Sequence, residues 1–398
     1  MHYASITDRL ANLGSEKWEI HLRGRQMAAS GEPLIELTIG EPDVGPDQRL
    51  LDVCSDAMRA GRTRYSNGRG EPTLLGALAE KYTRRSGREI SERNILCFPG
   101  TQTALFATLM GLVEKGDKVL VPDPYYATYE GLVSGPGAEL VPVPLSPGNR
   151  FHLRPEDIEA AYVPGCRVLL LNSPHNPSGA VLSRAEMEAI GDVCRKHDLW
   201  IVSDEVYEDL TFGAAFASPF DIEALADRTI AVSSISKSCA APGFRSGWAV
   251  GPEEFCRRVL PLSESMLFGN QPFISDMTAY ALTHDIPTAA LMRKQYAARA
   301  GLINARLRDV EGLRPMVPEA GMFVLLDVSE TGLDGYQFAS RLLDAHRVSV
   351  MPGSSFGESA KYFVRLSLTV PEVQLAEACD RITAFASNIN MNSRRLVS

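Results

Sequence analysis

Short apolar runs recur along the middle of the chain, from about residue 95 to 250, and alternate with longer helix-like stretches. The runs are rich in valine, isoleucine and leucine, and they cover residues 118–122, 167–171, 199–203, 229–232 and 248–251. Continuous apolar runs of this length are typical of strands that are buried on both faces. Strands and helices in this alternation predict an α/β fold, with a mainly parallel sheet covered by helices on both faces.

Two of the helical stretches have recognisable beginnings. Ser183 and Glu186 form a capping box ahead of a helix that we expect over residues 183–197. Another helical run begins with Gly-Thr-Gln-Thr at Gly100 and continues to about Glu114. The first backbone N–H groups of a helix are free to bind an anion, so this second beginning is a candidate phosphate site.

The composition narrows the class of protein and its partners. The chain has 398 residues, of which 45% are hydrophobic and 22% charged, as in an ordinary globular protein. A net charge of −9 and the absence of a dense Lys/Arg block argue against a nucleic-acid-binding protein. Charged residues interrupt the N-terminal segment and no apolar segment has membrane-spanning length, so we expect neither a secretory signal nor a membrane anchor. Seven scattered cysteines without a C-x-x-C pair predict reduced thiols in a cytoplasmic protein and no metal site.

Polar clusters follow the ends of the predicted strands. The segment 172–179, the pair Asp204 and Tyr207, and Lys237 each come after one of the apolar runs, and the helix beginning at Gly100 adds a fourth cluster. Ligands of parallel sheets bind beyond the carboxyl ends of the strands. Each cluster alone would suit an ordinary loop, but their common position at one edge of the sheet predicts a shared site.

The segment 234–247 carries the strongest chemical signal. It reads Ser-Ile-Ser-Lys-Ser-Cys-Ala-Ala-Pro-Gly-Phe-Arg-Ser-Gly, with Lys237 among small hydroxyl residues. The amine of Lys237 could form a Schiff base with a carbonyl, while Ser234 and Arg245 could hold an anion beside it. An isolated Ser-x-Ser-Lys also occurs by chance. Together with a carboxylate and ring contacts, however, the amine and the anion cradle are the groups that pyridoxal phosphate requires.

These motifs and their order resemble the class I aminotransferases of the aspartate aminotransferase superfamily, which have fold type I. The resemblance extends from Gly40 to Arg365, nearly the whole chain. It implies a pyridoxal-5′-phosphate-dependent transaminase that moves the α-amino group of an L-amino acid to a 2-oxo acid in a ping-pong reaction. It also implies a large cofactor-binding domain over residues 46–285 and a smaller α+β domain made of residues 1–45 and 286–398.

The resemblance assigns roles to individual residues, with Lys237, Asp204 and Tyr207 as the catalytic set. Lys237 would bind the aldehyde of the cofactor and then carry the proton, and Asp204 would pair with the pyridine nitrogen. Tyr207 and Asn176 would hydrogen-bond the phenolic oxygen, and Tyr126 would stack on the ring. The implied phosphate contacts are Thr101, Gln102, Ser234 and Arg245.

The same resemblance implies how the substrate binds and that the protein is a homodimer. Arg365 would grip the substrate α-carboxylate with its fork of N–H groups, beside Asn176 and the backbone of Gly40. Tyr65 would reach the phosphate of the neighbouring subunit, so the two active sites would be shared. Tyr126 stands where aspartate aminotransferase itself has tryptophan, so specificity for aspartate is not implied.

The substrate and the type of reaction stay open at this point. Segments such as Trp-Glu-Ile-His and Leu-Asn-Ser-Pro-His-Asn-Pro-Ser-Gly-Ala resemble a subgroup that includes arginine–pyruvate transaminases. Arginine as donor and pyruvate as acceptor are therefore our hypothesis. A pyridoxal-phosphate-dependent C–S β-lyase would show the same motifs. A non-enzymatic, aminotransferase-like regulatory domain is an alternative of another class, but such proteins usually carry a DNA-binding module, for which Gly40 leaves no room ahead of it.

Two further features near these motifs are expected to be structural. His175 precedes Asn176, but Lys237 already supplies the base, so we expect no catalytic role for the imidazole. Trp18 and Glu19 could line the mouth of the substrate site, but an anchor for the N-terminal arm is the favoured interpretation.

Overall fold

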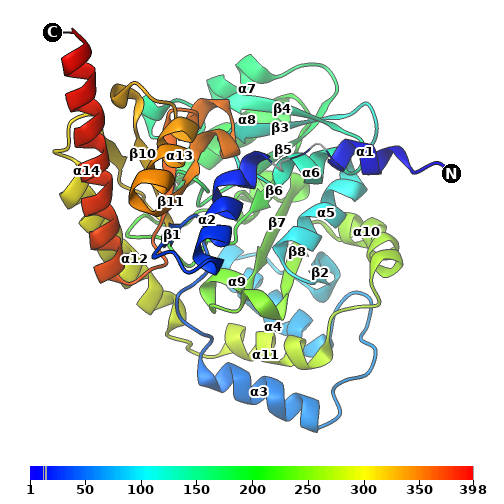
Figure 1. Ribbon diagram of the computed structural model, residues 1–398. Coiled ribbons are helices and arrows are strands. Elements are labelled where there is room, and N and C mark those ends of the chain that lie inside the picture. Colours follow the sequence, from blue (N-terminus) through cyan, green and yellow to red (C-terminus); the bar gives the residue numbers. More distant parts are fainter. Residues whose placement is uncertain (12, 14–15, 398) are drawn as a thin grey trace.

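Two β-sheets organise the chain in the computed structural model, which describes residues 1–11, 13 and 16–397 (Figure 1). The larger sheet has seven strands in the order β2-β8-β7-β6-β5-β3-β4. All neighbouring strands in it are parallel except for the two pairs that β8 makes with β2 and β7. The prediction of an α/β fold with a mainly parallel sheet is therefore confirmed.

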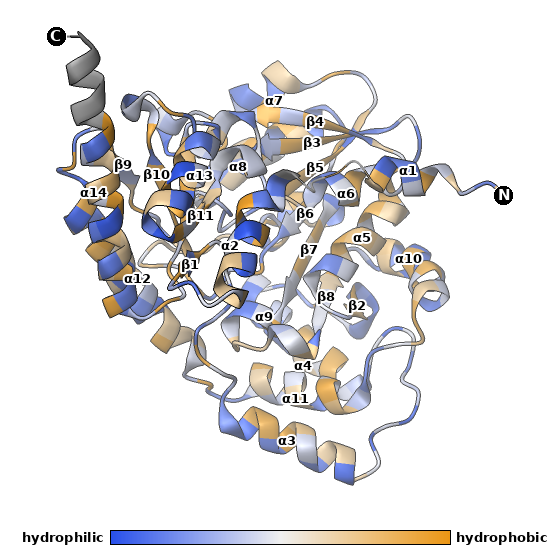
Figure 2. Ribbon diagram, viewed as in Figure 1, coloured by the Kyte–Doolittle hydropathy of each residue, from blue (hydrophilic) through white to orange (hydrophobic). Residues whose placement is uncertain are grey.

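The strands of the larger sheet are short and mostly buried. They are β2 (Ile95–Phe98), β3 (Lys118–Asp123), β4 (Glu139–Pro144), β5 (Cys166–Asn172), β6 (Trp200–Asp204), β7 (Thr229–Ser234) and β8 (Gly247–Val250). The five central strands coincide with the five apolar runs, and Figure 2 shows the middle of β7 as hydrophobic. The two edge strands were not among the predictions. β4 is half exposed and contains two prolines, so it forms no continuous apolar run.

Helices cover both faces of this sheet. One face packs against α5 (Thr101–Leu112), α6 (Tyr129–Ser134) and α10 (Glu253–Met266). The other packs against α4 (Pro72–Ser86), α7 (Pro155–Ala161), α8 (Arg184–Lys196) and α11 (Pro272–Thr283), with α3 (Gln48–Arg59) on α11. The capping box of Ser183 and Glu186 is present at the beginning of α8. Helix α5 begins where predicted and ends slightly before Glu114.

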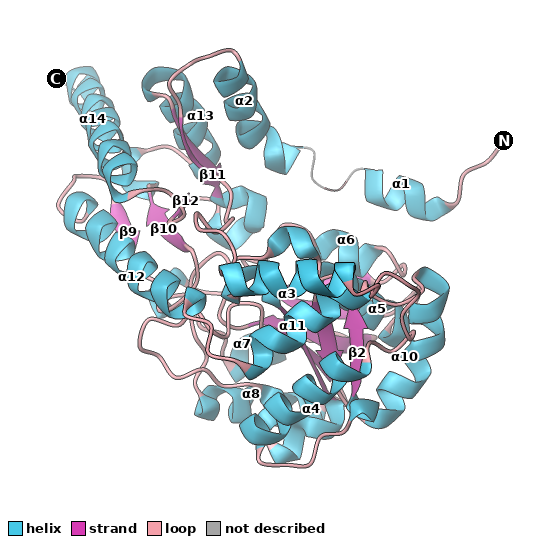
Figure 3. Cartoon of the chain, turned by 90° about the horizontal axis from the view of Figure 1, so that it is seen from below, coloured by secondary structure: helices cyan, strands magenta, loops and turns pink. Residues whose placement is uncertain are grey.

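The smaller sheet has the order β1-β11-β12-β10-β9. Its strands are β1 (Ile35–Leu37), β9 (Arg314–Met316), β10 (Phe323–Asp327), β11 (Val348–Pro352) and β12 (Phe363–Ser367), and its helices are α2 (Glu19–Ala29), α12 (Thr288–Leu307), α13 (Gly335–His346) and α14 (Glu372–Val397). Figure 3 shows these elements on one side of the molecule, away from β2, α4 and α10. Helix α1 (Ser5–Ala11) lies apart from them, against α6. Within the described residues, no helix is both long and apolar enough to cross a bilayer.

A network of buried ion pairs lies beneath the turn that follows β6. Arg85 of α4 contacts Glu205 at 3.0 Å, Glu208 at 2.8 Å and Asp221 at 2.7 Å. Lys81, one helical turn earlier, contacts Glu208 at 2.7 Å. Burial raises the pKa of Glu205 to about 7, although the charge of Arg85 opposes this shift. Helix α4 thus fixes the segment that begins directly after the last residue of β6.

Candidate active site

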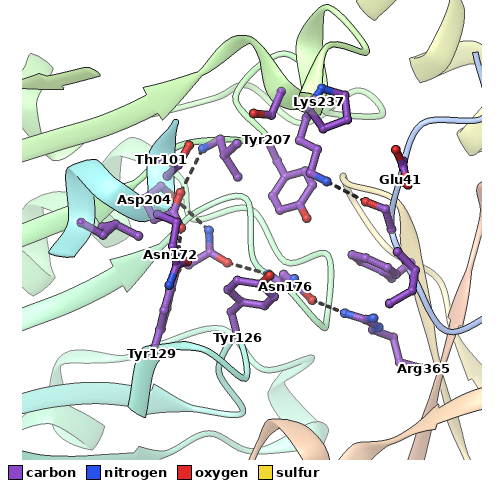
Figure 4. A pocket seen from close by; sticks show the side chains of 18 of the residues that line it. Glu41, Thr101, Tyr126, Tyr129, Asn172, Asn176, Asp204, Tyr207, Lys237 and Arg365 are labelled. Atoms are coloured by element: carbon purple, nitrogen blue, oxygen red, sulfur yellow. Dashed lines mark hydrogen bonds between the residues drawn. The ribbon is translucent and has the colours of Figure 1, made fainter. Parts of the chain in front are cut away.

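A cavity of about 540 Å³ opens between the two sheets, at the carboxyl ends of β5 and β6 (Figure 4). Most of the predicted site residues line it, although they come from distant parts of the chain. They are Gly40, Thr101, Gln102, Tyr126, Asn176, Asp204, Tyr207, Lys237, Arg245 and Arg365. Ser234 and Tyr65 do not line it. The expectation that the strand-end clusters share one site therefore agrees with the structure.

Lys237 lies on the short helix α9 (Ile235–Ser238), which begins directly after β7. Its Nζ atom donates a hydrogen bond of 2.6 Å to the carbonyl oxygen of Gly40, across the cavity. Burial lowers the pKa of Lys237 to about 8, although the negative charge of Glu41 opposes this shift. A substantial share of the amine is therefore neutral slightly above neutral pH, as a nucleophile or a base must be.

Asp204 is the last residue of β6 and is almost fully buried. The hydroxyl group of Tyr129 donates a hydrogen bond of 2.7 Å to its Oδ2 atom, and the backbone N–H of Val206 donates one of 3.3 Å to Oδ1. Burial raises the pKa of Asp204 to about 6, and the bond from Tyr129 opposes this rise. A buried carboxylate of this kind is stabilised by a cationic partner, such as a protonated ring nitrogen.

The beginning of α5 forms an anion cradle. Gly100 precedes the helix with φ +87, and a Cβ atom on it would lie 2.1 Å from Nη2 of Arg245. Only glycine allows both this backbone conformation and this close approach. The free N–H groups of α5 and the guanidinium group thus face the same space, which suits a phosphate. Thr101 donates a 2.8 Å hydrogen bond to Ser234, which lies behind the cradle, so direct contact of Ser234 with the phosphate stays a prediction.

Arg365, on β12, is buried with its guanidinium group already fixed. Nη1 donates to Oδ1 of Asn176 at 2.9 Å, and Nη2 donates to the carbonyl oxygen of Thr38 at 2.6 Å. The guanidinium carbon lies 3.7 Å from the ring centre of Phe323 and 4.4 Å from that of Phe356. Its Nε atom is buried without a hydrogen-bond partner among the described residues. The pKa of Arg365, lowered by burial to about 10, still leaves a cation at neutral pH.

The structure adds lining residues to which the sequence interpretation gave no individual role. They include Glu41, Tyr129, Asn172 and Ser236. Asn172 donates to the backbone oxygen of Asp204 at 3.0 Å and accepts from the backbone N–H of Asn176 at 2.8 Å. It is the last residue of β5 and lies opposite Asp204 in register, and it begins the segment 172–179 that the strand-end argument placed at the site.

Trp18 lies at the cavity and His175 lies outside its lining. Trp18 lines the cavity, although an anchoring role had been favoured, whereas Glu19 accepts a hydrogen bond from Tyr336 outside the cavity. His175 contacts Ser178 at 2.7 Å through Nδ1 and the carbonyl oxygen of Pro124 at 2.9 Å through Nε2. Burial lowers the pKa of His175 to about 4, so the ring is neutral. Its place outside the lining agrees with a structural role.

The chain is similar to known aminotransferases over nearly its whole length. Residues 32–382 match the family model of aminotransferase class I and II. The arginine–pyruvate transaminase of Pseudomonas aeruginosa is 41% identical over 98% of this chain and 99% of its own length. The aspartate/prephenate aminotransferase of Cereibacter sphaeroides is 32% identical over 97% of this chain and 100% of its own. The solved aspartate aminotransferase of Rhizobium meliloti superposes with a TM-score of 0.92 at 30% identity, covering 97% and 99% of the two chains.

The chain therefore belongs to the class I and II aminotransferases, with fold type I. It is a transaminase that depends on pyridoxal phosphate, and it acts on amino acids and oxo acids. The residues present fit this cofactor. Lys237 offers an amine for the aldehyde, Asp204 a buried carboxylate for the ring nitrogen, and the cradle at Gly100 and Arg245 a place for the phosphate.

Proposed function

We propose that Lys237 holds the cofactor and moves the substrate proton, with Asp204 and Tyr207 as its catalytic partners. When bound, pyridoxal phosphate takes up the electrons of the bond that is broken at the substrate Cα. Asp204 assists because a buried carboxylate favours a proton on the ring nitrogen that it contacts. Lys237 can take the substrate proton because its lowered pKa leaves a neutral amine available. Supporting these roles is the convergence of all three side chains in one cavity.

We further propose that the phosphate binds at the cradle through Thr101, Gln102 and Arg245, and that Tyr126 stacks on the ring. The phenolic oxygen would lie between Tyr207 and Asn176, which both line the cavity. The substrate α-carboxylate would bind to Arg365 and Asn176, near the backbone of Gly40. This assignment is supported by the buried, already oriented guanidinium group of Arg365, because two parallel N–H groups match a carboxylate.

Arginine is the amino donor that we propose, with pyruvate as the acceptor. The observation that supports arginine most is the 41% identity, over nearly the whole chain, with the arginine–pyruvate transaminase of P. aeruginosa. Glu41 adds a chemical reason. It and Asp204 are the carboxylates that line the cavity, and the Glu41 side chain has no hydrogen-bond or ion-pair partner among the described residues. A substrate guanidinium group would find its counter-charge there.

Glu41→Gln is expected to lower kcat/KM for arginine by about tenfold, as one weakened charged hydrogen bond would, while norleucine is affected little. The measurement is oxo-acid formation from arginine, lysine, norleucine and aspartate, with pyruvate and with 2-oxoglutarate. Glu19→Gln, outside the cavity, is the matched control and should leave all donors unchanged. An equal loss for every donor would mean that Glu41 acts on Lys237 and not on the substrate side chain.

A separate assay tests the β-lyase alternative. Formation of pyruvate and ammonia from a cysteine conjugate, without an acceptor, would favour the β-lyase.

We propose that the working assembly is a homodimer with shared active sites, in which Tyr65 reaches the phosphate of the partner subunit. Aminotransferases of this class are typically dimeric. Tyr65 is 87% exposed and lies outside its own cavity, with its ring centre 5.3 Å from that of Phe268, which is 74% exposed. Met266, two residues before Phe268 in the sequence, is also exposed. Large apolar side chains exposed together are typical of an interface.

Mixing Tyr65→Phe subunits with Lys237→Ala subunits is expected to restore activity that neither variant shows alone. In a hybrid dimer, the intact Lys237 is served by the unaltered Tyr65 of the other subunit. The experiment requires dissociation and reassociation of the two variants, followed by the transaminase assay. As a control, Tyr362→Phe, on a different exposed tyrosine, should behave like the wild type. Absence of restored activity in verified hybrid dimers would contradict the shared site.

The two sheets support the domain limits that we propose, residues 46–285 for the cofactor domain and residues 1–45 with 286–398 for the smaller one. Every strand of the larger sheet lies within the first range. The smaller sheet takes β1 from the N-terminal part and its other strands from the C-terminal part. The cavity lies between them, so a hinge movement on substrate binding would close it.

We also propose a cytoplasmic location. All seven cysteines are free and buried, within the part of the chain that the structure describes. Burial raises the pKa of Cys97, Cys194 and Cys256 to about 12, so these thiols stay protonated and unreactive. This use of cysteine as a small apolar residue is typical of proteins that fold in a reducing compartment.

A further inference from the structure

One buried carboxylate ties together separate parts of the loop that carries Tyr65. This Tyr65 loop comprises residues 60–71, between α3 and α4. Glu71, at its end, is only 7% exposed. Its Oε2 atom accepts a hydrogen bond of 2.5 Å from Nη2 of Arg62, and its Oε1 atom accepts one of 2.7 Å from the hydroxyl group of Ser66. Glu71 therefore ties the first part, the middle and the end of the loop together.

A second carboxylate fastens this loop to the body of the protein. Asp276, on α11, accepts hydrogen bonds of 2.7 Å and 2.9 Å from Nε and Nη2 of Arg62, in a fork. It also accepts one of 3.0 Å from Thr73, in the first turn of α4. The bonds from Asp276 and Glu71 raise the pKa of Arg62, and the bond from Arg62 lowers the pKa of Asp276. Arg62 is thus a fixed cation that joins the Tyr65 loop to α11.

The contrast with Tyr65 itself requires an explanation. The backbone around it is fixed by charged hydrogen bonds, yet its side chain projects from the loop, and its hydroxyl group has no hydrogen-bond partner among the described residues. Burying a carboxylate such as Glu71 costs free energy, which its hydrogen bonds from Arg62 and Ser66 must offset. A loop that only connects α3 to α4 would not need this order. A loop that must present one aromatic side chain in a set geometry would need it.

We propose that Glu71 and Arg62 are positioning residues, which hold Tyr65 in the geometry that the phosphate site of the partner subunit requires. This inference rests on the shared-site homodimer proposed above. Glu71 does not line the cavity of its own subunit. Its effect on the cofactor should therefore appear in the other subunit.

Glu71→Gln is expected to weaken cofactor binding roughly tenfold, the loss that corresponds to one hydrogen bond to a charged group. Cofactor affinity is measured by titrating cofactor-free protein and following the visible absorbance of the Lys237 adduct. Ser66→Ala, which removes one of the bonds and keeps the ion pair, should shift the affinity in the same direction by less. The matched control is Asp56→Asn, which breaks the exposed pair with Arg59 on α3 and should change nothing.

Hybrid dimers separate positioning across the interface from a merely structural role. In a hybrid of Glu71→Gln and Lys237→Ala subunits, the one intact Lys237 faces the unaltered Tyr65 loop of its partner. We expect its cofactor affinity to return to the wild-type value. If the defect persists in the hybrid, Glu71 acts within its own subunit and the inference is overturned.

A comparison with Tyr65→Phe distinguishes failure of the shared site from failure of the positioning role of Glu71. If Tyr65→Phe leaves cofactor affinity unchanged, the shared site itself fails. If Tyr65→Phe weakens binding but neither Glu71→Gln nor Ser66→Ala does, the shared site stands and the positioning role of Glu71 is refuted.

Discussion

Replacing Lys237 with alanine is expected to lower transaminase activity by about 10⁴-fold or more. A positioned acid–base group contributes roughly 10²–10⁴-fold by itself, and the covalent attachment of the cofactor is lost as well. The visible absorbance of the cofactor adduct should disappear together with acceptor-dependent oxo-acid formation. Lys196→Ala, at the exposed end of α8, is the control and should keep both. A Lys237→Ala protein that retained the absorbance and turned over normally would refute the assignment.

The rate at which the cofactor attaches to Lys237 is expected to depend on pH. Only the neutral amine attacks the aldehyde, and burial lowers the pKa of Lys237 to about 8 in the cofactor-free protein. The rate of cofactor attachment should therefore rise with pH, reach half of its limit near pH 8 and level off about one pH unit higher. Stopped-flow absorbance measurements between pH 6 and about 10 would show the rise. A rise centred near the ordinary lysine pKa would mean that the amine is more exposed to water than the structure indicates.

Replacing Arg85 with methionine is expected to lower the free energy of unfolding by about 3–5 kcal/mol, because removing one member of a buried ion network leaves the others uncompensated. Arg85 is the common partner of Glu205, Glu208 and Asp221, and Glu205 is fully buried. Chemical denaturation of the cofactor-free protein measures the loss. Arg84→Met offers a matched control at the next position, where an exposed pair with Glu80 should contribute little. A similar loss in both variants would show that the network has no special importance.

The pH dependence of this loss follows from Glu205. Its pKa is raised by burial to about 7 in the folded protein, above its ordinary value, so the folded state binds the proton more tightly than the unfolded chain does. Stability contributed in this way is present at low pH and is lost as the pH rises through the folded-state pKa. The charge of Arg85 lowers this pKa, so its removal raises the pKa of Glu205 further and makes the carboxylate harder to ionise in the folded variant. The deficit of Arg85→Met should therefore be larger at pH 8 than at pH 6. A deficit independent of pH would argue against an uncompensated carboxylate.

The apolar runs predicted the centre of the larger sheet but not its edges or its one reversed strand. β8 is a short buried apolar run like the parallel strands of this sheet, so nothing in the run itself indicates its direction. The direction is set by the connection, residues 235–246, which holds only α9 and a short turn. Parallel neighbours usually need a crossover helix that runs back along the sheet, and α9, with 4 residues, is too short for this, so β8 pairs antiparallel. The edge strand β4 was not predicted because it is half exposed and therefore forms no continuous apolar run.

The residues of the candidate site were likewise predictable where they lie at strand ends, and not where helix packing brings them to the cavity. Asp204 and Lys237 were predictable because they lie at or shortly after the ends of strands, and strand ends meet at a common edge. Tyr129 is different. Its hydroxyl group reaches Asp204 only because α6 packs against the sheet at a particular angle, and no spacing in the sequence encodes that angle. Trp18 likewise reaches the cavity through the path of the N-terminal arm.

The fixed guanidinium group of Arg365 has a consequence for selectivity. Two aromatic rings and two hydrogen bonds orient it before any substrate arrives, so the conformational entropy of a long side chain is lost during folding and not during binding. An amino acid gains the full attraction of its carboxylate. A primary amine of the same size would leave a buried cation facing an uncharged group, and the unpaired Nε would stay unpaired. In its proposed role, Arg365 thus rejects decarboxylated analogues by a penalty that is built into the empty site.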